Sequence, residues 1–465
     1  MDPFKKRLII LGGIVVLTVV GIVIYRAATG GKTTDGSIVK TPPKAVALTW
    51  WGDLPPAQAQ PIIDAYVVAR PYVTITYTQL DAKTGEQQLI EAWARNVGPD
   101  IYALRNEELK HFASTGLIEP MPASTVSYTY TRSKSLGIKE SIVIRKVEKP
   151  APSQTTLQNT FVVGAFQDLY QGGQILGFPL QFDSVAMLYN QQLLDGAGIL
   201  TPLQTWDDVV RLIPKLTLED NQGELVRAGL ALGRSANVPR TPEIFTALFR
   251  AYNIPLTDPT GTLATFGQDK NTGGVLAVLT SFAMPTKKTY TWNETFPSAL
   301  DALAQGKVAI AFGTAADYAD VTGRTTGADI RVAAFPQGFQ KAYVADYKVQ
   351  TVAKKTKDAN VAWDFLRFAA DPAQTEKLTV VSGQTPAVRS LVDAVISGEG
   401  QDTGGAKVFA QQAATATGWF MGADPTQARK ALNDLVDEVT TQSSPTTEAL
   451  DRATQRFQLS LGVKN

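Results

Sequence analysis

Strand-like and helix-like segments alternate between residues 45 and 116, and this alternation constrains the fold more than any other feature of the chain. Residues 45–50 and 73–80 have the apolar, β-branched and aromatic character of strands, whereas residues 55–70 carry apolar side chains at helical spacing. Helices that alternate with strands in this way cover the faces of a parallel sheet. We therefore predict an α/β fold for the first part of the chain.

Candidate ligand contacts follow two of these predicted strands. The first strand ends at Trp50, Trp51 and Asp53, and the third ends near Arg105 and Asn106. Ligands bind beyond the carboxyl ends of strands in α/β sheets, because loops and helix N-termini converge there. Side chains alternate along a strand, so we expect one of the two tryptophans to lie in the core and the other to face a ligand cleft.

Composition limits the kinds of function that this chain can have. Its 465 residues are 44% hydrophobic and 19% charged, which suits two or three soluble domains. The 44 basic and 43 acidic side chains give a net charge of +1, which provides no long-range attraction for nucleic acid. Cysteine is absent, and this excludes disulfides, thiolate metal sites and cysteine nucleophiles. We predict no nucleic-acid partner, no cofactor and no metal.

The N-terminus has the pattern of a membrane anchor. Lys5, Lys6 and Arg7 precede an apolar run at residues 8–25, and a helix of this length covers about 27 Å, close to the thickness of a hydrocarbon core. The run is longer than the apolar region of a signal peptide, about 7–15 residues, and residues 27–30 form a poor small-residue cleavage site because Arg26 adjoins them. We therefore favour an uncleaved signal anchor over a cleaved signal peptide.

Charge sets the orientation of this predicted anchor. The basic cluster at residues 1–7 keeps that end in the cytoplasm, so that the large C-terminal part lies outside the cell or in the periplasm. Residues 26–44 are rich in Gly, Thr, Lys and Pro and contain little to bury. We expect them to form a flexible linker between the membrane and the folded part.

The segment from Phe178 to Val210 reads FPLQFDSVAMLYNQQLLDGAGILTPLQTWDDVV and predicts a strand, a helix, a turn and a second helix. Asn190 stands where the first helix begins, and Thr205 is placed to cap the second. Its pattern of G-x-P-x-x-x-D, Y-N-x-x-L-x-x-x-x-G-I and T-W-D-D resembles the segment that follows the first lobe crossing in extracytoplasmic solute-binding proteins of ABC importers, the group that includes maltose-binding protein.

The resemblance extends along most of the chain. It includes L-T-W-W-G at 48–52, G-P-D-I-Y-A-L at 98–104, F-A-S-T-G-L-I-E-P-M at 112–121 and FPSALDALAQGKVAIAFG at 296–313. It implies a two-lobed periplasmic-binding-protein fold with several interlobe crossings, in a monomer that captures a small solute for ABC permease subunits. The solute that the resemblance implies is a sugar. The implied divisions are lobe 1 at 45–180, with an insertion at about 122–160, lobe 2 at 181–334, a lobe 1 return at 335–377, and a C-terminal part of lobe 2 at 378–465.

The resemblance also implies which side chains contact the solute. Aromatic faces pack on sugar rings, and polar side chains satisfy hydroxyls that burial would otherwise leave unpaired. The expected stacking residues are Trp50 or Trp51, Trp292, Tyr318, Tyr343 and Trp419. The expected polar contacts are Asp53, Arg105, Asn106, Asp183, Asn293 and Asp346, although Asp183 fits a hinge hydrogen bond equally well.

Two departures from the family pattern bear on the cargo. Leu104 stands at a third-strand position that is Trp in maltose-binding proteins, and Thr314, Ala315 and Ala316 stand where relatives carry a stacking Trp. These differences argue against maltodextrin as the solute. The insertion at 122–160 has no counterpart in the pattern either, and we interpret it as a surface hairpin or a partly disordered loop.

Two other classes of function stay open at this point. His111 is the only histidine and has no catalytic or metal motif around it, so we predict that the chain is not an enzyme and has no catalytic residues. A carboxylate-pair glycosidase needs only two of the 43 acids and is the enzymatic alternative. The third possibility is a tethered envelope sensor or adhesion protein that keeps the binding fold.

Overall fold

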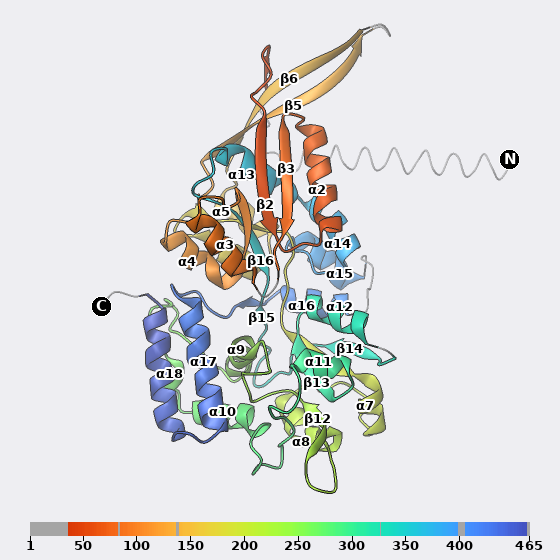
Figure 1. Cartoon of the computed structure of the whole chain (residues 1–465), viewed down its shortest axis with the longest axis vertical. Helices are drawn as coiled ribbons and strands as arrows, with labels where there is room; N and C mark the ends of the chain where they lie inside the picture. Colours follow the sequence, from red (N-terminus) through yellow and green to blue (C-terminus); the bar gives the residue numbers. More distant parts are fainter. Residues whose placement is uncertain (1–35, 82–83, 136–138, 326, 399–404, 463–465) are drawn as a thin grey trace, which may run out of the picture.

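The computed structural model describes residues 36–465 except 82–83, 136–138, 326, 399–404 and 463–465. These residues form two lobes, one above the other in Figure 1, each built around its own sheet and its own hydrophobic core. The prediction of a mixed α/β, two-lobed fold is confirmed.

The sheet of the first lobe has the order β3-β2-β4-β16-β9. Strand β2 is parallel to β3 and β4, whereas β16 is antiparallel to β4 and β9. The strands are β2 (Val46–Gly52), β3 (Val73–Gln79), β4 (Ile101–Arg105), β9 (Phe178–Pro179) and β16 (Lys348–Val352). The surrounding elements before the first crossing are α2 (Pro56–Ala69), α3 (Gly85–Ala94), η1 (Asn106–Glu108), α4 (Leu109–Ser114), α5 (Gln154–Thr160), α6 (Val163–Leu169), β7 (Tyr170–Gln171) and β8 (Gln174–Ile175).

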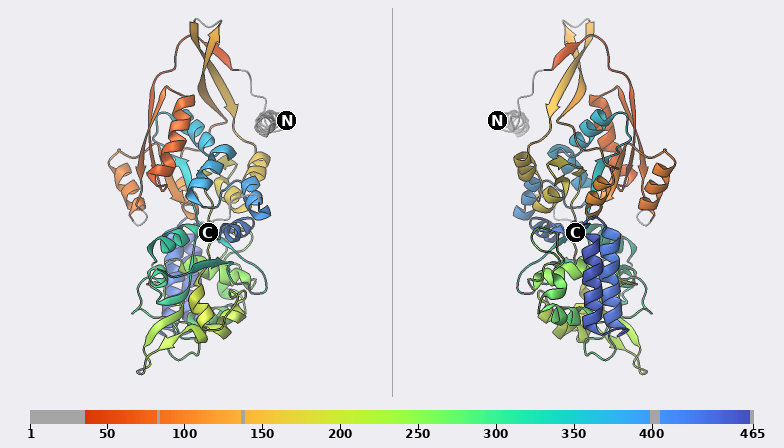
Figure 2. Two further views of the ribbon diagram at one scale, coloured as in Figure 1. Left: turned by 90° about the vertical axis from the view of Figure 1, so that its right-hand side faces the viewer. Right: turned by 90° about the vertical axis from the view of Figure 1, so that its left-hand side faces the viewer.

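The sheet of the second lobe has the order β11-β12-β13-β10-β14, with β10 antiparallel to both of its neighbours. Its strands are β10 (Ala186–Asn190), β11 (Leu218–Glu219), β12 (Leu225–Leu230), β13 (Val308–Gly313) and β14 (Ile330–Ala333). Its helices are α7 (Gln191–Gly196), α8 (Trp206–Leu216), α9 (Thr241–Ala251), η2 (Phe266–Gln268), α10 (Thr272–Ser281), α11 (Ala299–Ala304), α12 (Ala315–Arg324), α17 (Pro425–Thr440) and α18 (Thr446–Ser460). Helices α17 and α18 lie side by side in both figures of the whole chain (Figures 1 and 2).

The start of the second lobe has the local structure that its sequence predicts. The Asn190 side chain accepts a hydrogen bond from the Leu193 amide at 3.2 Å and begins α7. The Thr205 hydroxyl accepts from the Asp208 amide at 3.1 Å and begins α8. Each cap satisfies one of the backbone donors that the first turn of a helix leaves unpaired.

Within the residues that the structure describes, the chain passes between the two cores three times. The first crossing runs from Phe182 to Val185, the second lies between Val344 and Ala345, and the third runs from Ala416 to Trp419. At the second and third crossings, β15 (Val344–Ala345) pairs in parallel with β17 (Thr417–Gly418). The Val185 amide donates to the Val344 carbonyl at 3.0 Å, so the first crossing joins the same hinge.

The later lobe boundaries differ from the expected ones. Phe335 and Val344 belong to the second core, although the return to lobe 1 was expected at residue 335. Conversely, Leu378 and Val392 belong to the first core, although 378–465 was expected to lie in lobe 2. The return includes α13 (Ala359–Ala369), α14 (Pro372–Ser382) and α15 (Arg389–Ser397). Helix α16 (Ala406–Ala413) contributes Phe409 to the second core and Ala410 and Ala413 to the first, and the chain then crosses at β17.

A long antiparallel arm projects from the first lobe on the side away from the second lobe (Figures 1 and 2). It consists of β5 (Ser124–Ser135) and β6 (Lys139–Pro150), so the insertion is a hairpin. A third strand, β1 (Ser37–Val39), pairs with β6. The expectation of a flexible linker at 26–44 is therefore wrong at residues 37–39, because β6 offers β1 a free edge to pair with.

The predicted membrane span at residues 8–25 lies outside the described residues. Among the helices that the structure does describe, none combines the length and the apolar character that a membrane crossing requires.

A buried ion pair holds α2 against α13 in the first lobe. The Arg70 guanidinium contacts the Asp364 carboxylate, and the Tyr66 hydroxyl donates to the same carboxylate at 3.0 Å. Arg70 is 5% exposed and Asp364 is 2% exposed, so neither charge has solvent to replace a lost partner.

We predict that Asp364→Ala lowers the free energy of unfolding by about 3–5 kcal/mol, because it leaves Arg70 buried without a counter-charge. Denaturant unfolding measures this loss. The control is Asp301→Ala, which breaks the half-exposed pair with Arg324 and should cost at most about 1 kcal/mol. Equal losses in the two variants would contradict the assignment.

Candidate functional site

Asp183 joins the first crossing to a helix of the second lobe. One carboxylate oxygen accepts from the amides of Ser184 and Ala315 at 2.8 and 2.9 Å, and the other accepts from the Ala316 amide at 3.2 Å. Burial raises the pKa of Asp183 to about 6, against the backbone donors, which lower it. Both oxygens thus serve the N-terminus of α12, which is the hinge role that the sequence left open.

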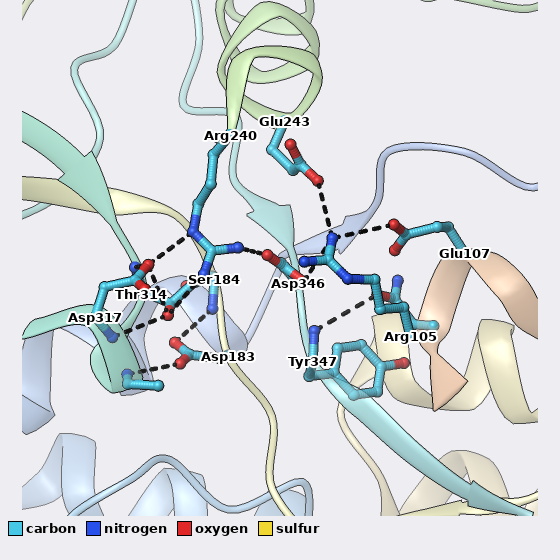
Figure 3. A network of polar contacts seen from close by, with 12 residues as sticks. Arg105, Glu107, Asp183, Ser184, Arg240, Glu243, Thr314, Asp317, Asp346 and Tyr347 are labelled. Carbon is cyan, nitrogen blue, oxygen red and sulfur yellow. Dashed lines mark hydrogen bonds and ion pairs between the residues drawn. The ribbon is translucent and has the colours of Figure 1, made fainter. Parts of the chain in front are cut away.

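The second crossing carries its own charged residue, Asp346. Figure 3 shows its carboxylate between Arg240, with which it forms an ion pair, and Arg105, whose Nη1 lies 4.0 Å away. Arg240 also donates from Nε to Asp317 at 2.7 Å. Two guanidiniums from different lobes therefore meet at one hinge carboxylate.

Arg429 bridges the two lobes. Its guanidinium lies 2.8 Å from Glu107 in η1 of the first lobe, and 2.5 Å from Glu243 in α9 of the second lobe. The side chains of these two acids are 2% and 0% exposed. Burial alone would raise the pKa of Glu107, but the guanidiniums of Arg105 and Arg429 outweigh it and hold that pKa at about 2. Glu107 is thus ionised, and its charge is compensated partly from the opposite lobe.

Trp419 lies under this bridge. The Arg429 guanidinium carbon is 5.1 Å from the centre of the indole ring, which is the geometry of a cation–π contact. The ring is 2% exposed and belongs to the second core. The face of the Trp419 ring therefore contacts the guanidinium that forms the interlobe ion pair.

A buried hydrogen-bond cluster backs the site on the first-lobe side. Asp168 accepts from Asn106 at 3.0 Å and from the Tyr347 hydroxyl at 2.6 Å. Burial raises the pKa of Asp168 to about 7, although both hydrogen bonds lower it. The cluster fixes the loop after β4 against the segment that follows the second crossing.

The structure gathers about half of the predicted site residues at the lobe junction. Arg105, Asn106, Asp183, Asp346 and Trp419 take part in the contacts just described. Tyr343 packs against both cores immediately before β15.

The remaining predicted residues lie elsewhere. Trp50 is the core member of its pair, with its Nε1 donating to Gln350 at 2.9 Å, whereas Trp51 is partly exposed at the end of β2. Asp53 accepts from Gln350 at 3.1 Å. The contact expected of Trp292 is wrong for this structure, because the ring is 0% exposed and stacks on Phe296.

Two further predicted residues make local contacts within the second lobe. Asn293 donates to the Tyr290 hydroxyl at 3.1 Å and accepts from Thr295. The Tyr318 hydroxyl donates to the Ile330 carbonyl at 3.3 Å. Solute contact by these two residues, and by Trp51 and Asp53, stays a prediction.

Sequence reasoning missed several members of the site, namely Glu107, Arg240, Glu243, Asp317 and Arg429. For Glu243 a signal exists, because it is the only acid in the otherwise largely apolar helix TPEIFTALFRA. A charge on an apolar helix indicates a buried partner. For the others, the pairing depends on contacts between distant segments.

The side chains of the site interact with one another through hydrogen bonds and ion pairs. The carboxylates of the site form ion pairs with guanidiniums or accept hydrogen bonds from backbone amides. Within the part of the chain that the structure describes, no group of three or more acidic, histidine or cysteine residues is arranged to hold a metal ion.

Comparison with protein families decides what kind of protein carries this site. Residues 62–408 match the family described as bacterial extracellular solute-binding protein. The chain belongs to this family. The match includes most of the first lobe, the part of the second lobe before α17, and the first two crossings.

Solved solute-binding structures share the fold of this family member at low sequence identity. An ABC substrate-binding protein of Listeria monocytogenes, in complex with cycloalternan, has a TM-score of 0.70 at 14% identity and covers 90% of this chain and 100% of its own. A solute-binding protein of Thermotoga lettingae bound to α-D-tagatose has 0.68 at 17%, with coverage of 90% and 100%. The cyclic α-maltosyl-1,6-maltose binding protein of Arthrobacter globiformis has 0.68 at 15%, with coverage of 90% and 99%. No curated protein sequence matches the chain.

We predict that Arg429→Met lowers the free energy of unfolding by about 3 kcal/mol or more, because Glu243 loses its bonded counter-charge while it stays buried. Denaturant unfolding provides the measurement. Lys430→Met is the matched control, since the neighbouring Lys430 is 72% exposed and pairs only with Asp434 at the surface. A comparable loss in the control would contradict the role of Arg429.

We also predict that Asp168 makes stability depend on pH. Its pKa in the folded protein lies above the ordinary value of 3.8, so the folded state holds a proton that the unfolded state releases. Its contribution is therefore fully present below pH 3.8 and is lost as the pH rises towards 7. Relative to Asp168→Asn, the unmodified protein should lose stability between about pH 4 and about pH 7. Urea unfolding at both values tests this, and parallel curves would contradict it.

Proposed function

We propose that this chain is a membrane-anchored receptor outside the cytoplasm, which captures a small solute between its lobes and delivers it to an ABC import permease. The observation that carries the proposal is the hinge of three crossings with a charged interlobe site beside it. Hinge closure around a ligand is a known mode of domain motion.

The proposed solute is a carbohydrate. Structures with the same fold are described with cycloalternan, tagatose and maltosyl-maltose ligands, which supports a sugar as the first class to test. Guanidinium and carboxylate groups at the lobe junction can pair with sugar hydroxyls on desolvation. Trp51, which is partly exposed at the end of β2, is the proposed stacking face.

Closure follows from where these groups lie. Arg105 and Glu107 belong to the first lobe, whereas Arg240 and Glu243 belong to the second. A solute that bonds to both sets contacts the closed form more than the open form, and this difference is what shifts the population towards closure. No step of this mechanism breaks a covalent bond in the solute.

The anchoring part of the proposal rests on residues 8–25. Their apolar run after a basic cluster supports a single membrane span with the two lobes outside, in a receptor that works as a monomer. A pair of permease genes next to the gene for this chain would support delivery to an importer.

We predict saturable binding of at least one neutral sugar, without turnover, by the full-length chain. Thermal shift across sugars, polyols and peptides is the measurement, and a ligand at one hundred times its Kd should stabilise the protein by about 2.7 kcal/mol. Arg105→Gln should weaken binding, whereas Arg331→Gln, which alters an exposed pair on β14, should not. Product formation would indicate an enzyme, and no binding across the panel would favour a sensor or adhesion role.

A further inference from the structure

An open cavity of about 360 Å³ lies beside the hinge, apart from the ion pairs described above. Its lining comes from three segments: Arg250 and Asn253 at the end of α9, Gln340 to Tyr343 before β15, and Thr417 in β17. Glu243 and Arg250 are seven residues apart on α9, so they share one helix face at positions about 10 Å apart along the axis. One face of α9 thus serves the interlobe ion pair at one end and this cavity at the other.

Arg250 is a cation without a matching anion in this cavity. Its guanidinium donates to the Thr417 hydroxyl at 3.0 Å and to the Gly418 carbonyl at 2.9 Å, both of which are neutral. In the described part of the chain, no carboxylate lies within ion-pair distance of it. Burial lowers the pKa of Arg250 to about 10, and the nearby charge of Asp168 offsets only part of that effect.

The other lining groups favour an anion as well. Lys341 adds a second positive charge, and Asn253, Gln340 and Thr417 add neutral donors. No acidic side chain is among the described residues that line the cavity. Arginine has five N–H donors in a planar fork that matches carboxylate and phosphate oxygens, and Arg250 uses only two of its donor groups.

One feature opposes an anion here, namely the carbonyl groups at the C-terminal end of α9. The structure covers them with Gln340. The side-chain amide of Gln340 donates to the Arg250 carbonyl at 2.8 Å, and its backbone N–H donates to the Ala251 carbonyl at 3.1 Å. The last two carbonyl groups of α9 are therefore hydrogen-bonded within the protein, which reduces their repulsion of an anion.

We propose that this cavity is a site for a small oxyanion, which binds the Arg250 guanidinium with Lys341 as the second cation. The anion would lie against Tyr343 and Thr417, whose backbones are linked at 3.3 Å where the chain crosses between the lobes. A bound anion would add a polar link between Arg250 on α9 and the crossing segments of the hinge. Apart from Tyr343, the lining shares no residue with the predicted solute contacts, so the proposal holds whichever neutral solute the receptor takes.

Isothermal titration of the full-length chain with sodium sulfate, against sodium chloride at equal ionic strength, tests the site. We expect saturable binding of one sulfate per chain. Arg250→Leu should weaken it by about tenfold or more, since a hydrogen bond to a charged group is lost. Absence of saturable sulfate binding to the unmodified chain would overturn the proposal.

A second variant keeps the test valid if Arg250→Leu does not fold. Lys341 is exposed, so Lys341→Glu should fold and still weaken sulfate binding, whereas Lys288→Glu makes the same charge change at an exposed residue outside the lining. Equal weakening of sulfate binding by these two variants would overturn the site, because the weakening would then follow from the net charge of the protein and not from the position of Lys341.

Titration with glucuronate and glucose distinguishes the source of the anion. Glucuronate that competes with sulfate, while glucose does not, would support the site as one for the acidic group of a solute. Sulfate binding without glucuronate binding would support a site for a free inorganic ion. A receptor that binds neutral sugars but neither anion would keep the proposed function and lose this site.

Discussion

The bridge from Arg429 to Glu107 and Glu243 is the interaction on which the arrangement of the lobe junction depends. Each of these carboxylates is almost without solvent, and an unpaired charge in that position costs several kcal/mol. The guanidinium that compensates them comes from α17, near the end of the chain. The two lobes therefore meet in this way only where α17 is packed against α9.

The same constraint extends along the hinge. Asp346 at the second crossing is compensated by Arg240, and Asp183 at the first crossing by the amides that begin α12. The first and second crossings thus each carry a compensated carboxylate, and the third is held by the backbone pairing of β17 with β15. Groups that orient one another in this way lose little conformational freedom when they bind a further polar group.

Local features of the fold could be predicted from the sequence, but the partners across the junction could not. Asn190 and Thr205 cap helices through contacts three residues away, which a short pattern contains. Glu107 and Arg429 are 322 residues apart, and no periodicity relates them. The later boundaries failed for a similar reason, since an amphipathic helix such as α15 has the same pattern whichever lobe it covers.

Aromatic residues show the same limit within the candidate site. Trp292 and Trp419 look alike in sequence, both next to polar or aromatic neighbours in loops. In the structure Trp292 donates to Asn237 within the second lobe, whereas Trp419 lies under an interlobe guanidinium. Only the long-range packing distinguishes the two, because each is buried for the same reason, its large apolar surface.

The docking of β1 on the hairpin arm changes what the anchor would do. Only eleven residues, 26–36, separate the proposed span from that strand, and such a length reaches about 40 Å at most. Strand β1 would stay within that distance of the bilayer, so the receptor would be tethered to the membrane and would not diffuse freely in solution. Its encounters with a permease would then take place in the thin layer next to the membrane, so that their frequency would depend on the number of receptors per membrane area and not on their concentration in the surrounding volume.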